Sequence, residues 1–69
     1  MLTDAALSAA LLDVGRPVDA DDVAAFAGID PTAPNAGLAV VLTIRARFDR
    51  PIPPPQVHRV LDALRAARG

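Results

Sequence analysis

The stretch Leu38-Ala39-Val40-Val41-Leu42-Thr43-Ile44-Arg45-Ala46-Arg47-Phe48 decides how this chain is expected to fold. Every even-numbered residue in it is apolar, and the odd-numbered residues change from small or apolar to basic toward its end. Successive side chains of a strand point to opposite faces, and β-branched residues favour strands. The pattern therefore predicts a β-strand over residues 38–48 with one apolar face.

The predicted strand has no evident mate within the chain. The other extended stretch, over residues 51–55, is interrupted by prolines, and a lone strand leaves its N–H and C=O groups unpaired. We therefore expect the strand to pair with a second copy or with a partner protein. A helix over the same residues fits the pattern less well, because it places Arg45 beside Leu38 and Leu42.

The flanking segments carry the signals of three helices. Thr3 and Asp19 are good N-caps, and apolar residues follow each at helical spacing. Gly28 is placed to end the second helix in the left-handed conformation. The predicted elements are helices over 2–14, 19–27 and 55–68, the strand over 38–48, and a stiff proline connector over 51–55.

These elements make one small α+β domain over residues 1–69, in the order helix, helix, strand, helix. The alternative is an all-α domain with a helix-turn-helix-like start. A core of this size rarely contributes more than about 3 to 5 kcal/mol, and the chain has no cysteine to form a disulfide. Association is the stabilising device that remains.

Composition indicates the setting in which the protein works. Every basic residue is Arg and every acidic residue is Asp, which is typical of a GC-rich bacterial or phage genome. The first residues lack the basic start of a signal peptide, and no apolar run reaches the ~20 residues of a membrane span. We expect a cytoplasmic protein, or a virion component if phage-encoded, with no membrane partner.

The net charge of −1 conceals a division between the two halves of the chain. Residues 1–37 contain six Asp and one Arg, a charge of −5, whereas residues 38–69 contain six Arg and two Asp, a charge of +4. Opposite charges attract, so the two halves are expected to approach each other within one chain or between chains. Two solvent-exposed faces that differ in sign explain the division equally well.

The residues needed for enzyme chemistry are sparse. Ser8 and His58 are the only serine and histidine, and they are far apart in the sequence, whereas a nucleophile needs a base within reach. The run from Asp19 to Asp22 lacks the ligand and the glycine that a calcium loop requires next. The sequence predicts a protein that is not an enzyme, with no cofactor, no metal and no evident small-molecule substrate.

Residues 10–30, reading Ala-Leu-Leu-Asp-Val-Gly-Arg-Pro-Val-Asp-Ala-Asp-Asp-Val-Ala-Ala-Phe-Ala-Gly-Ile-Asp, resemble the first two helices of bacterial winged-helix regulators. They are also similar to the opening helices of small phage head-to-tail connector proteins. The first resemblance implies DNA binding, but a basic recognition helix should follow Ile29, and a proline-containing turn follows instead. The net charge of −1 also argues against binding to phosphates.

The sequence thus predicts a non-enzymatic interaction or structural subunit that associates with itself or with another protein, such as an oligomeric adaptor or a virion component. A small winged-helix-like DNA-binding regulator is the alternative. The candidate interface residues are Leu38, Val40, Leu42, Ile44, Phe48, Val57, Leu61 and Leu64. The candidate contacts to a nucleic acid or an acidic partner are Arg45, Arg47, Arg50 and Arg59.

Overall fold

Four helices and no strand make up the part of the chain that the computed structural model describes, residues 1–12 and 14–68. The helices are α1 (Asp4–Ala10), α2 (Ala20–Ala27), α3 (Ala36–Phe48) and α4 (Pro54–Arg68). Residue 13, within the helix expected over 2–14, and residue 69, the last of the expected domain, lie outside the described residues. None of the described helices combines the length and the apolar character needed to cross a bilayer.

Helix α3 corrects the main prediction from the sequence. The expected strand over 38–48 is helical, so the α+β class is wrong, and the all-α alternative agrees with the structure. Val40, Ile44 and Phe48 are spaced by four residues, which places them on one side of a strand and equally on one side of a helix. The expectation that another chain completes a sheet therefore falls with the strand.

The caps show why the first two helices begin where they do. The Thr3 hydroxyl accepts a hydrogen bond from the Ala6 N–H, and the Asp19 carboxylate accepts one from the Asp22 N–H, as expected of N-caps. Gly28, in contrast, has an ordinary helical conformation (φ −74°, ψ −10°) instead of the expected left-handed one. The left-handed conformation belongs to Asp49 (φ 52°), which ends α3.

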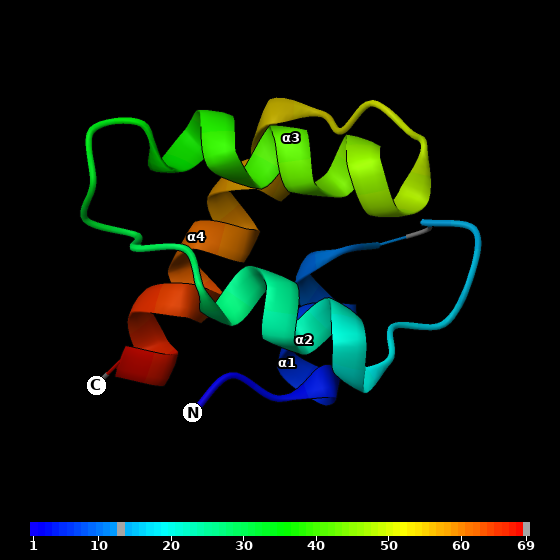
Figure 1. Ribbon diagram of the computed structural model, residues 1–69, viewed down its shortest axis with the longest axis horizontal. Helices are drawn as coiled ribbons and strands as arrows, with labels where there is room; N and C mark the ends of the chain where they lie inside the picture. Colours follow the sequence, from blue (N-terminus) through cyan, green and yellow to red (C-terminus); the bar gives the residue numbers. More distant parts are fainter. Residues whose placement is uncertain (13, 69) are drawn as a thin grey trace.

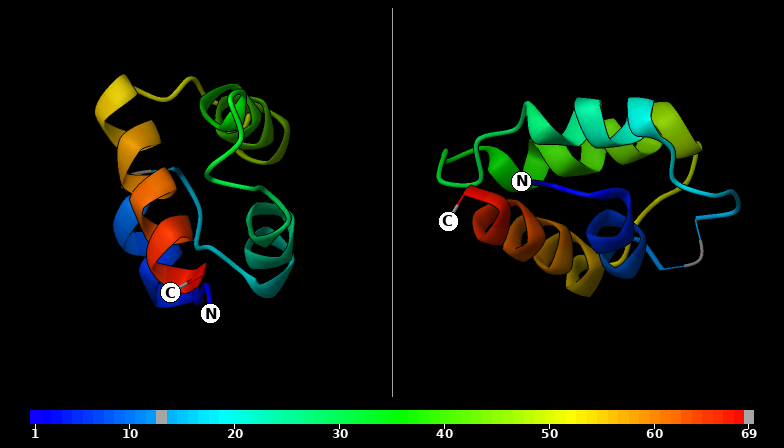
Figure 2. Two further views of the ribbon diagram at one scale, coloured as in Figure 1. Left: turned by 90° about the vertical axis from the view of Figure 1, so that its left-hand side faces the viewer. Right: turned by 90° about the horizontal axis from the view of Figure 1, so that it is seen from below.

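The helices form two layers (Figures 1 and 2). Helices α2 and α3 run antiparallel in one layer, and α1 and α4 lie together in the other. Helix α3 packs across the layers on α4, and α1 packs on α2. Each helix therefore contacts two others around a shared core.

One apolar core lies between the layers. Leu7 and Phe26 are fully buried, and they come from α1 and α2. Their neighbours in the core come from all four helices and from the loops, and the largest of them are Leu2, Leu11, Val40, Ile44, Phe48, Val60, Leu61 and Leu64. The core thus uses one side of α3, which leaves the opposite side of that helix uncovered.

Candidate protein-interaction surface

Helix α3 is apolar on both of its sides. Its first nine residues, 36–44, contain no charged side chain, and Thr43 is the only polar residue among them. A helix that is apolar all round is ordinarily buried all round. In this molecule only one side of α3 faces the core, so apolar side chains on its other side meet solvent.

The outer face of α3 consists of Leu38, Leu42, Arg45 and Ala46, all of which are exposed. Leu38 and Leu42 lie one helical turn apart, and they are 60% and 56% exposed. Arg45 follows Leu42 by three residues and therefore continues the same stripe. The outer face is thus a short apolar ridge with a cation at its C-terminal end.

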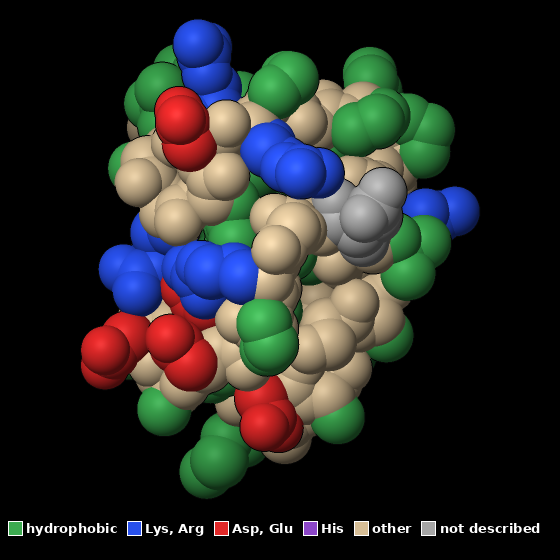
Figure 3. All heavy atoms as spheres, turned by 90° about the vertical axis from the view of Figure 1, so that its right-hand side faces the viewer, with side chains coloured by type: hydrophobic (Ala, Val, Ile, Leu, Met, Phe, Trp, Pro, Cys, Tyr) green, Lys and Arg blue, Asp and Glu red, His purple; other side chains and the backbone are tan. Residues whose placement is uncertain are grey.

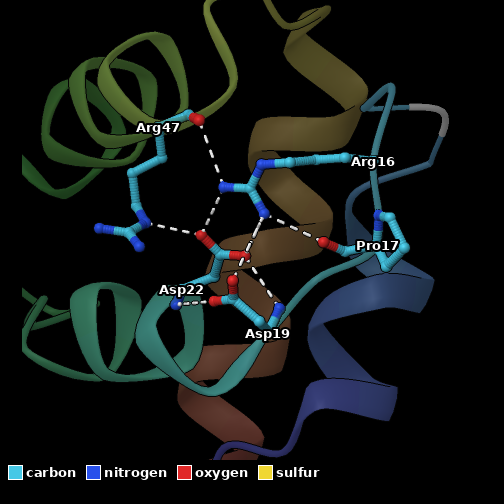
Figure 4. A network of polar contacts seen from close by, with 5 residues as sticks. All are labelled: Arg16, Pro17, Asp19, Asp22 and Arg47. Atoms are coloured by element: carbon cyan, nitrogen blue, oxygen red, sulfur yellow. Dashed lines mark hydrogen bonds and ion pairs between the residues drawn. The ribbon is translucent and has the colours of Figure 1, made fainter.

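A buried carboxylate fixes which side of α3 turns outward (Figure 4). Asp22, the third residue of α2, is fully buried. Its carboxylate accepts a bidentate pair of hydrogen bonds from the Arg16 guanidinium, at 2.8 and 2.9 Å. Arg47 on α3 donates a third hydrogen bond from Nε at 2.6 Å, and the Asp19 N–H donates a fourth at 2.9 Å. Two cations from distant parts of the chain therefore meet on one anion.

The same contacts keep the buried carboxylate charged. The hydrogen bonds from Arg16 are the largest influence on Asp22, and they hold its pKa well below its usual range. The hydrogen bonds from the Asp19 N–H and from Arg47 act in the same direction, whereas burial acts in the opposite one. Asp22 is thus an ionised side chain inside the protein, stabilised by three partners.

Arg16 also connects the loop before α2 to the C-terminal end of α3. Its guanidinium carbon lies 4.3 Å from the centre of the Phe48 ring, and its Nη2 donates to the Arg47 carbonyl at 3.2 Å. In this region basic side chains lie directly beside acidic ones on the molecular surface (Figure 3). Together with the Arg47–Asp22 pair, these contacts oppose rotation of α3 about its own axis and keep the outer face of α3 exposed.

The structure divides the candidate interface residues predicted from the sequence. Leu38 and Leu42 are exposed, and Val57 is partly buried against the core. The remaining five are buried within this chain: Val40, Ile44, Phe48, Leu61 and Leu64. Their apolar character is therefore used by the core of the protein itself.

The candidate arginine contacts are also divided. Arg45 and Arg59 are exposed, whereas Arg47 is partly buried and forms the ion pair with Asp22. The side chain of Arg50 lies over Gly15, close enough that a Cβ at that glycine would be 3.0 Å from an Arg50 nitrogen. The attraction between the two halves of the chain acts within the molecule, as the Arg47–Asp22 pair shows.

Asp22 is the residue whose role the sequence did not reveal. Its spacing from Asp19 is that of a capping box, and the structure has both hydrogen bonds of that motif. The sequence explained Asp22 only through the helix dipole. One of its ion-pair partners, Arg47, is 25 residues away, and no local pattern could have indicated that contact.

Ser8 and His58, the other residues considered for chemistry, are exposed on α1 and α4. The described residues contain no group of three or more potential metal ligands among Asp, Glu, His and Cys. Comparison of the chain with models of protein families, with curated proteins and with solved structures finds no match. The exposed ridge of α3 is therefore the feature from which a function can be argued.

Proposed function

We propose that this chain is a non-enzymatic protein-interaction module that binds another protein chain through the outer face of α3. The observation that carries the proposal is the exposure of Leu38 and Leu42, at 60% and 56%, on the part of α3 that contains no charged side chain. Docking of this ridge would remove both leucines from water, which is the main source of free energy in most protein associations. Arg45 at its end would favour a carboxylate on the partner.

The ion-pair network supports the same proposal. A side chain that binds a partner is more effective when its position is fixed before binding, because less conformational freedom is then lost. The Arg47–Asp22 and Arg16–Phe48 contacts hold the C-terminal half of α3 in one orientation. The ridge is thus presented by a helix whose rotation is restricted.

The alternative of a DNA-binding regulator finds less support. The helix that follows α2 begins only at Ala36, and its N-terminal half presents Leu38 and Leu42 to solvent instead of basic side chains. A recognition helix contacts base edges through its N-terminal residues, where polar and basic side chains are required. The exposed surface of α3 has the wrong chemistry for that task.

Site-specific photo-crosslinking tests the proposal. Benzoylphenylalanine is placed at position 38 or 42, or at exposed Ala66 on α4 as a control, in the full chain within the cells that make it. We expect covalent adducts with a protein from positions 38 and 42 and none from 66. The adduct from position 42 should disappear when Leu38→Asp is introduced. Equal labelling from all three positions, or none from 38 and 42, would contradict the proposal.

A further inference from the structure

We draw no further inference here: the strongest candidate, the apolar ridge of Leu38 and Leu42 on the outer face of α3, belongs to the site already described, and nothing in the structure shows which chain covers it.

Discussion

Replacing Asp22 with asparagine removes the charge at the centre of the ion-pair network and keeps the shape of the side chain. Asp22→Asn weakens four hydrogen bonds, two of them from Arg16 and one from Arg47. Breaking a fully buried ion pair typically costs about 3 to 5 kcal/mol. The side chains of Arg16 and Arg47 are 38% and 31% exposed, so water can partly solvate them. We therefore expect a loss of about 2 to 3 kcal/mol from the free energy of unfolding.

That loss is a large part of the stability of a domain of this size, which is on the order of 3 to 5 kcal/mol. It should lower the melting temperature, measured by circular dichroism at 222 nm, by roughly 10 °C or more. Asp21→Asn is the matched control, because Asp21 is the neighbouring residue on α2 and is exposed. Equal shifts for the two variants, or a more stable Asp22→Asn protein, would refute the role assigned to the network.

Three further predictions concern acid, the orientation of α3 and a loop glycine. The depressed pKa of Asp22 means that, as the pH falls, this carboxylate is protonated in the unfolded chain before it is protonated in the folded protein. Below about pH 4 the wild type should therefore lose stability steadily. In urea titrations the difference in free energy of unfolding between the wild type and Asp22→Asn should shrink over the same range. Ile44→Asp should unfold the protein because the Ile44 side chain is 1% exposed, whereas Leu42→Asp should leave the melting temperature nearly unchanged. Equal losses of stability would contradict the helical assignment, because Leu42 and Ile44 share a face only in a strand. Gly15→Ala should destabilise by about 1 to 2 kcal/mol because φ is +89° there, while Gly37→Ala, within α3 and with open space around it, should stabilise by about 0.5 to 1 kcal/mol. Denaturation curves in which both glycine variants lose stability would contradict this pair.

Local signals were sufficient to locate the helices outside residues 38–48. The N-caps Thr3 and Asp19 and the apolar spacing of Val60, Leu61 and Leu64 are properties of neighbouring residues, and the structure has them as the sequence suggests. Such signals act within one or two turns and need no tertiary contact. Helix boundaries still shift by several residues, as the end of α1 at Ala10 shows.

The helical state of α3 and the burial of Asp22 could not be predicted from the local sequence, because both depend on contacts with residues far along the chain. The spacing of Val40, Ile44 and Phe48 fits both periods, so Leu38 and Leu42 decided the prediction, and these leucines are apolar without being buried. Packing of α3 against α2 and α4 outweighs the strand preference of its β-branched residues. The outer face of α3 could therefore be located only after the core was known.

The separation in sequence of the residues around Asp22 has a consequence for the lifetime of the folded state. Arg16 is six residues from Asp22, but Arg47 is 25 residues away, so the network is complete only after α3 has packed on α2. Contacts that form late in folding have little effect on the folding rate and mainly slow unfolding. The network should therefore make unfolding slow. Although the equilibrium stability of the domain is small, each molecule would unfold rarely and would keep the outer face of α3 intact for long periods.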